Sequence, residues 1–281
     1  LFSTDADFMA DAFKLLSNIG EPKILPILLS NVYTTKGPDL QLAAINSLPE
    51  KLNNDVIKSI NVQYADLPRD SKKAWINYLA SHESHVSKLI SEVEKENIPK
   101  SDLEWPQIVH LMNYYDTKIR NYAREVFAIN EDRKAVLQNY LPSANMKGNA
   151  KKGKKLFDQN CAVCHQINGE GGTAFGPDLA TLKSRNKHSI ITEIINPNNS
   201  IADKYGQWEI DTNNGNHFIG IITSENENSL RLKTLGGTTQ NIEKTNIKSR
   251  QISRLSAMPN GLEGAITPEG MADLLALIKG E

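Results

Sequence analysis

Apolar residues recur every three to four positions through the first half of the chain, a spacing that predicts amphipathic helices. Nine segments before residue 142 show this spacing, so residues 1–142 are predicted to be helical throughout. The predicted helices are Ser3–Ile19, Lys23–Tyr33, Asp39–Leu48, Asp55–Ile60, Ser71–Ala80, Val86–Glu94, Leu103–Met112, Thr117–Ile129 and Asp132–Leu141.

The pattern changes in the second half, where five segments alternate apolar and polar residues between turn-forming stretches such as Asn213–Asn216. A short helix is expected before them at His188–Ile195, and an apolar-periodic helix after them at the C-terminus. We therefore expect a small antiparallel β insertion at about residues 206–255. Its predicted strands are Gln207–Thr212, His217–Ser224, Ser229–Thr234, Thr238–Glu243 and Ile247–Ser253.

Two of the N-terminal helices share a residue spacing. Leu40-Gln41, Ala44 and Leu48 recur 79 residues later as Ile119-Arg120, Ala123 and Phe127. This shift is about two units of the length typical of HEAT or armadillo repeats, in which a small alanine lets paired helices approach closely. Any amphipathic helix also shows such intervals. We expect a HEAT-like α-solenoid over residues 1–142, followed by a linker of small, polar and basic residues at 143–152.

Length and charge narrow the classes of function. At 281 residues the chain is long enough for two domains, and its net charge of −1 gives no indication of a nucleic-acid partner. With 39% hydrophobic residues the composition is ordinary for a soluble protein, and no apolar run approaches the ~18 residues of a membrane span. The chain begins with Leu1 rather than Met, so we expect a mature or excised fragment of a longer protein.

The motif that carries chemistry is Cys161-Ala162-Val163-Cys164-His165, the attachment sequence of a c-type haem. Two thiols three residues apart can each form a thioether with one vinyl group of a porphyrin, and the next imidazole then lies under the iron. A redox dithiol would need a preceding strand, but residues 151–160 predict a helix. A zinc site would need a second ligand pair, and the chain has only these two cysteines. Both remain alternatives.

Residues 153–281 resemble class I cytochromes c. In that class a proline twelve residues after the ligand histidine offers its carbonyl oxygen to the imidazole, a role that the resemblance gives to Pro177. The class also places its second axial ligand in a Met-Pro pair before the last helix, which implies Met258 here. An ordinary Gly-Pro turn and a core-filling methionine are the alternatives. The fallback ligands are His188, His217 and Met271.

A closer resemblance is to the planctomycete/verrucomicrobial-type haem-binding domain. It rests on an ordered series of segments: Gly153–Phe157, Cys161–His165, Gly176–Leu179, Ile195–Pro197 with Ile201, Tyr205 and Gly220, Met258–Leu262 and Met271–Leu275. Such domains often follow HEAT-like repeats and an upstream β-propeller resembling sugar dehydrogenases. Ala257 and Asn260 replace the family's usual Leu and Glu beside the methionine. The inserted sheet sets this chain apart from ordinary class I cytochromes.

The resemblance implies a mainly α fold, in which a HEAT-like solenoid precedes a class I cytochrome c-like domain with a small antiparallel β insertion. The helix that begins at Gly153 would cross the last helix, with Phe157 packed beneath the crossing. Covalent haem attachment takes place outside the bacterial cytoplasm, so a periplasmic or exported protein is expected. The predicted contacts across the crossing are Leu274, Leu275 and Ile278.

We expect an electron-transfer module with one haem c, attached through Cys161 and Cys164 and ligated by His165 and Met258. It would accept electrons from a dehydrogenase partner or an upstream domain of the same chain, and would not itself be an enzyme. A five-coordinate haem protein acting as a small-ligand sensor or peroxidase is the first alternative, and a HEAT-based docking scaffold is the second. Expected contacts to haem propionates or the haem edge are Arg185, Tyr205 and Trp208.

Overall fold

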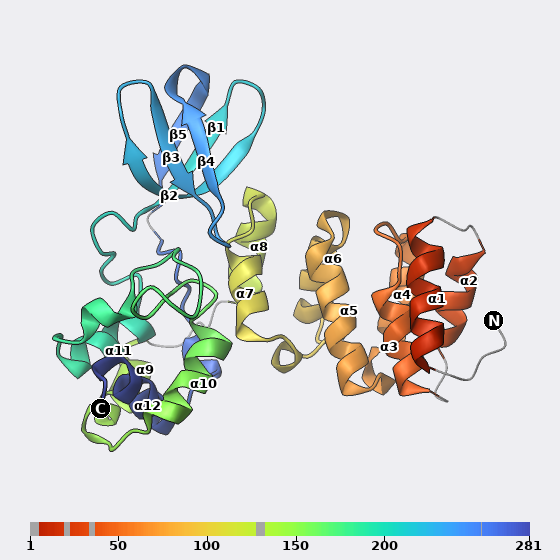
Figure 1. The fold of residues 1–281 in the computed structure, drawn as a ribbon, viewed down its shortest axis with the longest axis horizontal. Coiled ribbons are helices and arrows are strands. Elements are labelled where there is room, and N and C mark those ends of the chain that lie inside the picture. Colours follow the sequence, from red (N-terminus) through yellow and green to blue (C-terminus); the bar gives the residue numbers. More distant parts are fainter. Residues whose placement is uncertain (1–5, 20–22, 34–36, 128–132, 254) are drawn as a thin grey trace. The chain divides into compact units, whose positions relative to one another are not determined.

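The structure is a computed structural model that describes residues 6–19, 23–33, 37–127, 133–253 and 255–281. The predictions made for Leu1, Ser3, Ile129 and Asp132 lie outside these ranges. The chain divides into two compact units, residues 1–107 and residues 108–281, and each is described by itself (Figure 1).

The first unit is made of helices (Figure 1). Within it α1 packs against α2 and α3, α3 packs against α5, and α5 packs against α6. Their bounds are α1 Ala6–Asn18, α2 Ile24–Val32, α3 Pro38–Asn46, α4 Asn54–Val62, α5 Arg69–Ser81 and α6 Glu83–Glu94, and α7 Trp105–Met112 spans the division between the units.

Helix α5 shows why these segments fold as predicted. Its apolar residues Trp75 and Ile76 are fully buried, and so is Leu79, which follows them by four and three residues, the spacing of one helix face. Across the described residues, all nine helices predicted before residue 142 are confirmed as α1–α9, with ends shifted by a few residues. Their arrangement as a HEAT-like solenoid stays a prediction.

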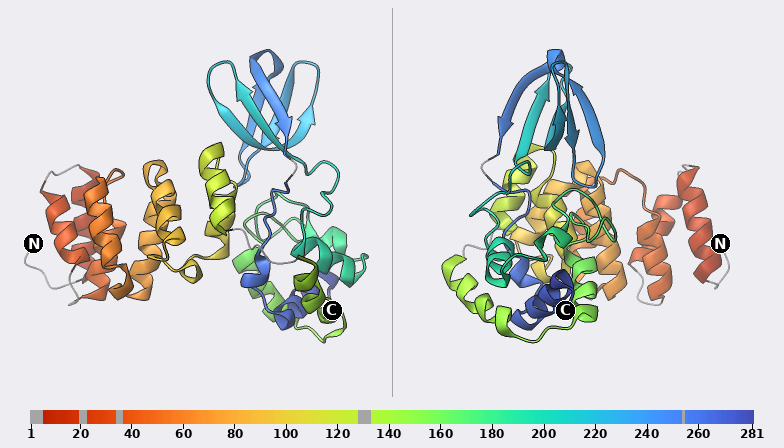
Figure 2. Two further views of the ribbon diagram at one scale, coloured as in Figure 1. Left: turned by 180° about the vertical axis from the view of Figure 1, so that it is seen from behind. Right: turned by 60° about the vertical axis from the view of Figure 1, so that its left-hand side comes forward.

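The second unit contains α8 (Thr117–Phe127), α9 (Arg133–Tyr140), α10 (Ala150–Asn160), α11 (Lys187–Ile195) and α12 (Pro268–Lys279). Helices α10 and α12 lie against each other in both views of Figure 2. They approach so closely at Gly153 that an added Cβ atom would lie 2.1 Å from the carbonyl oxygen of Asp273. The predicted crossing is therefore confirmed, and glycine is the residue that permits it.

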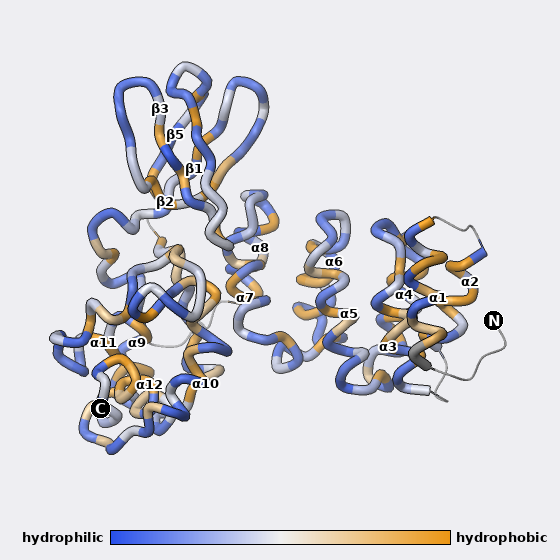
Figure 3. The backbone as a smooth tube through the Cα atoms, in the orientation of Figure 1, coloured by the Kyte–Doolittle hydropathy of each residue, from blue (hydrophilic) through white to orange (hydrophobic). Residues whose placement is uncertain are grey.

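Within the described part of the chain, five antiparallel strands form one sheet in the order β4-β3-β2-β1-β5. The edge strands β4 and β5 are joined only by the short 3-10 helix Lys244–Asn246, so the sheet must curl until its two edges approach at that end. The loops gathered at that end are hydrophilic (Figure 3). The predicted β insertion is confirmed with these strands: β1 Gln207–Thr212, β2 His217–Glu225, β3 Ser229–Lys233, β4 Thr239–Glu243 and β5 Ile247–Ile252.

The division at residue 107 lies ahead of the boundary predicted at residue 142. Helix α9 packs against α11 and α12 of the second unit. Residues 141–145 form a 3-10 helix in which Ser143 and Ala144 are buried. The domains predicted at 1–142 and 153–281, and the linker at 143–152, stay predictions.

None of the helices in the described ranges combines the length and the apolar character needed to cross a membrane.

Candidate haem site

A cavity of about 700 Å³ in the second unit brings together the residues that the sequence singles out. Cys161, Cys164, His165 and Met258 all line it. The volume lies in the range of cofactor and ligand sites, roughly 300–1,000 Å³. Most of the remaining lining is apolar, including Phe175, Leu179, Ile190, Leu262, Leu274 and Ile278.

The turn after α10 places the motif on one wall of this cavity. Helix α10 ends at Asn160, and the carbonyl oxygen of Cys161 then accepts hydrogen bonds from the N–H groups of Cys164 at 3.0 Å and His165 at 2.9 Å. This tight turn directs the side chains of Cys161, Cys164 and His165 to the same cavity.

The imidazole of His165 is oriented by the loop that follows. Its Nδ1 lies 2.7 Å from the carbonyl oxygen of Pro177. Because a carbonyl only accepts, Nδ1 carries the proton and Nε2 keeps its lone pair. Gly176 passes so close that an added Cβ atom would lie 2.5 Å from Cε1 of the ring. The loop therefore sets both the tautomer and the position of the ring.

The carboxylate of Asp178 holds this loop in shape. It accepts hydrogen bonds from the N–H groups of Ala180 at 2.8 Å, Gly169 at 2.7 Å and Asn168 at 3.0 Å. These donors, Ala180 first, lower the pKa of Asp178. The ionised carboxylate thus ties together the residues on both sides of Pro177.

Burial shifts the pKa of each of the three motif side chains toward its neutral form. It lowers the pKa of His165, so the neutral imidazole, which is the form that ligates metals, persists to lower pH. Burial raises the pKa of both Cys161 and Cys164 to about 12, so both thiols stay protonated at neutral pH. Neither cysteine forms a disulfide.

Met258 is the predicted second ligand, and it lies in a loop between β5 and α12. The three fallback ligands, all within the described residues, do not line the cavity. His188 is exposed at the start of α11, and Met271 is fully buried in α12. The Nδ1 atom of His217 lies 2.6 Å from Oδ1 of Asp211 in the sheet.

The four remaining predicted contacts have different surroundings. Arg185 and Tyr205 line the cavity, although the guanidinium of Arg185 is paired with Glu193. Phe157, predicted beneath the helix crossing, is fully buried in α10 and does not line the cavity. Trp208 lies away from the cavity, packed on the sheet core beneath the guanidinium of Arg250, 4.4 Å from the ring centre.

Most of the apolar side chains that line the cavity were not predicted from the sequence to be part of its wall. Phe175 stands in the loop before Gly176, and Leu262 begins the 3-10 helix Leu262–Gly264. Periodicity gives no signal at either position. Ile190 and Leu274 occupy apolar helix positions whose burial is predictable, but the pattern does not say which cavity they would face.

The donor groups and the space fit a haem c. Two protonated thiols at the motif spacing, an imidazole with its Nε2 lone pair available, and a thioether share one cavity with apolar walls. The close approach of Gly176 shows that the fold holds the imidazole of His165 in place at this cavity.

Comparison with known families gives a match to the Cytochrome c family over residues 150–280, a little under half of the chain. Comparison with curated proteins gives no match. The family match supports a c-type cytochrome domain at residues 150–280, with haem-based electron transfer as the activity that such a domain implies.

Proposed function

We propose that the chain is a single-haem c-type cytochrome module for electron transfer. Cys161 and Cys164 would carry the thioether links, and His165 and Met258 would be the axial ligands. The observation that carries the proposal is that these four side chains line one cavity while His165 is already oriented by Pro177. A haem bound here would supply one-electron transfer between its ferric and ferrous states.

The protein's own residues have three tasks in this proposal. Pro177 holds the proton on Nδ1 of His165, which directs Nε2 toward a metal. Apolar side chains such as Phe175 and Leu262 exclude water, which favours the less charged, reduced state. The thioether of Met258, a soft donor, would also favour the ferrous state and raise the potential.

We also propose a family, a location and an electron donor for this module. We place the chain with the planctomycete/verrucomicrobial-type haem-binding proteins, exported to the bacterial periplasm, where covalent haem attachment takes place. Its electrons would come from a sugar-dehydrogenase-like partner or from an upstream domain of the same chain. HEAT-like helices in the first unit would serve as the docking part.

The test is the visible spectrum of the holo-protein, oxidised and reduced, for wild type, Met258→Ala and Met271→Ala. Met271→Ala is the matched control because it removes the same side chain from a buried site that does not line the cavity. We expect a weak sulfur-to-iron band near the red end in wild type and in Met271→Ala, and its loss in Met258→Ala.

A high-spin wild-type spectrum that Met258→Ala leaves unchanged would overturn this assignment. The five-coordinate alternative, a small-ligand sensor or peroxidase, would then take its place. That alternative predicts tight binding of small ligands to the wild-type protein.

A further inference from the structure

The segment that contains Met258 forms hydrogen bonds with residues that are far away in the sequence. The N–H of Ser253 donates to the carbonyl oxygen of Gln207 at 2.7 Å, and the N–H of Ser256 donates to Oδ1 of Asn198 at 2.7 Å. The carbonyl oxygen of Ala257, the residue before Met258, accepts from Nδ2 of Asn113 at 3.0 Å.

The side-chain amide of Asn113 is held in one orientation by its hydrogen bonds. Asn113 follows α7, its side chain is buried, and its Nδ2 group also donates to the carbonyl oxygen of Val109 at 3.0 Å. Its Oδ1 accepts from Nε2 of Gln207 at 3.1 Å. Both amide hydrogens and the amide oxygen therefore have partners, and a flipped amide would face two carbonyls with an oxygen. The orientation of the side chain is fixed by its surroundings.

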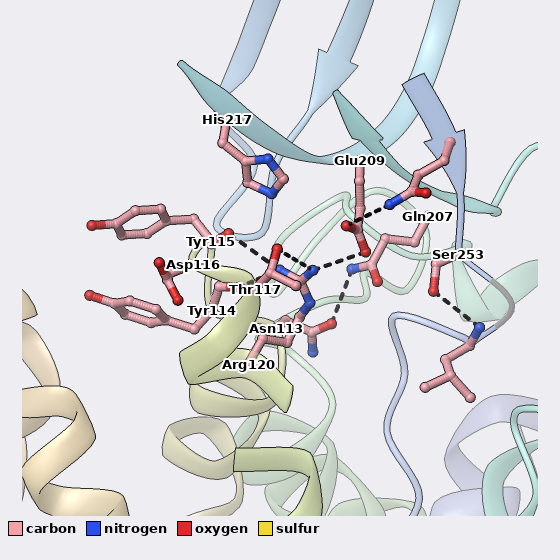
Figure 4. A network of polar contacts seen from close by, with 12 residues as sticks. Asn113, Tyr114, Tyr115, Asp116, Thr117, Arg120, Gln207, Glu209, His217 and Ser253 are labelled. Carbon is pink, nitrogen blue, oxygen red and sulfur yellow. Dashed lines mark hydrogen bonds and ion pairs between the residues drawn. The ribbon is translucent and has the colours of Figure 1, made fainter. Parts of the chain in front are cut away.

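A second layer holds both Asn113 and Gln207 in place (Figure 4). Glu209 lies two residues beyond Gln207 on the same face of β1, and its carboxylate is 2.9 Å from Nη2 of Arg120 in α8. Arg120 is 1% exposed and also donates to the carbonyl oxygen of Tyr114 at 2.9 Å, in the turn that contains Asn113. The turn and the strand are thus locked together beside the Met258 loop.

We propose that Asn113 is a positioning residue for Met258. By holding the Met258 loop at the cavity, Asn113 limits how readily other ligands replace the thioether. The inference rests on the proposed function, in which Met258 is an axial ligand. Ala257 is buried, so loss of the Asn113 donor leaves its carbonyl without this partner and favours loop positions in which water reaches that oxygen. Those positions withdraw the neighbouring Met258 from the cavity.

The experiment uses the full-length holo-protein in its oxidised form, with imidazole as a competing ligand followed in the visible spectrum. Asn113→Leu keeps the side-chain size and removes every polar contact. Asn113→Asp keeps an acceptor for Gln207 but cannot donate to Ala257. We expect both variants to bind imidazole about tenfold more tightly than wild type, the effect of one lost buried hydrogen bond.

Asn61→Leu is the matched control. Asn61 is also buried, and it accepts a hydrogen bond from Nε1 of Trp75 at 2.7 Å in the first unit. The control lowers the stability of the chain through a comparable loss, and we expect its imidazole affinity to equal that of wild type. If Asn113→Leu does not accumulate as a folded protein, Asn113→Asp provides the measurement.

Wild-type imidazole affinity in the folded Asn113 variants would overturn the proposal. A second readout separates this failure from failure of the proposed function. Amide hydrogen exchange over residues 253–262 reports loop fastening whether or not Met258 is a ligand. Faster exchange in Asn113→Leu than in Asn61→Leu supports the positioning role, and equal exchange counts against it.

Discussion

At the scale of single residues, the imidazole of His165 is fixed from two sides. The carbonyl of Pro177 accepts its Nδ1 proton at 2.7 Å, and the backbone of Gly176 closes against the ring. A ligand held in this way needs no rearrangement when a metal binds, so binding energy is not spent on ordering it.

Replacement of Gly176 by alanine should disturb this arrangement. The new Cβ atom would lie 2.5 Å from Cε1 of His165, closer than real contacts allow, so the ring or the loop must shift. We expect Gly176→Ala to accumulate with less haem and with an altered visible spectrum. Gly264→Ala is the control, since an added Cβ atom there has nothing within 4 Å. Equal haem content in the two variants would contradict the assigned role of Gly176.

The site residues differ in how far the sequence predicts them. Haem attachment depends on local spacing, so Cys161, Cys164 and His165 can be recognised from adjacent letters. Trp208 could not be placed, because a strand sends alternate residues to opposite faces and only the fold decides which face meets the cavity. Asn113 gives no sequence signal, since its contacts lie in segments 94 and 144 residues away.

At the scale of secondary-structure elements, the crossing of α10 and α12 sets two opposed effects against each other. Gly153→Ala should stabilise an isolated helix by up to about 1 kcal/mol. The crossing reverses the sign, because the added Cβ atom would meet the Asp273 carbonyl at 2.1 Å. We expect the free energy of unfolding to fall by about 1–3 kcal/mol.

Urea denaturation of the holo-protein measures this change. Lys155→Ala, at an exposed position of α10, is the control and should alter stability by no more than about 0.5 kcal/mol. A Gly153→Ala protein as stable as wild type would show that the two helices can separate without cost.

The sheet contains a carboxylate that makes its stability depend on pH. Glu225 at the end of β2 pairs with Arg250 and Lys244, each at 2.8 Å, and these partners lower its pKa from 4.5 to about 2. A lowered folded-state pKa contributes stability that is fully present above pH 4.5 and is lost as the pH falls toward 2.

Glu225→Gln should therefore destabilise the sheet at neutral pH, and the difference from wild type should shrink below about pH 5. Amide hydrogen exchange of β2 and β5 at several pH values measures it. Glu227→Gln removes a carboxylate from the same turn and serves as the control. A difference that stays constant from pH 7 to about pH 3 would show that the ion pairs contribute nothing.

The strand and helix bounds follow from hydrophobic patterning, but the assignment of helices to units does not. Helices α8 and α9 show the same apolar spacing as α1–α6 and were grouped with them in the predicted repeat region. In the structure they belong to the second unit, where Tyr140 donates to the carbonyl oxygen of Ile266 at 2.7 Å. Periodicity identifies a buried face but not its partner.

At the scale of the whole molecule, the position of the division can be tested with two fragments. Residues 108–281 keep the Arg120–Glu209 ion pair and the hydrogen bond from Asn113 to Ala257, whereas residues 143–281 lose both. We expect the longer fragment, loaded with haem, to unfold at a clearly higher urea concentration. The shorter fragment lacks this ion pair and this hydrogen bond, and it also lacks the packing of α9 against α11 and α12. Equal midpoints would favour the boundary predicted at residue 142.

The pairing of β1 with β5 has a consequence for how the chain reaches its folded state. His165 and Met258 both line the cavity, and 93 residues of chain separate them. Because β5 pairs with β1 and Ser253 bonds to Gln207, a formed sheet brings its first and last residues together. Its own residues then no longer add to the length of the loop. The loop left to close is roughly half as long, which recovers about 0.6 kcal/mol of chain entropy. The effective sequence separation between the residues that close the cavity is shortened in the same way. The cavity should therefore close fastest in chains whose sheet has already formed.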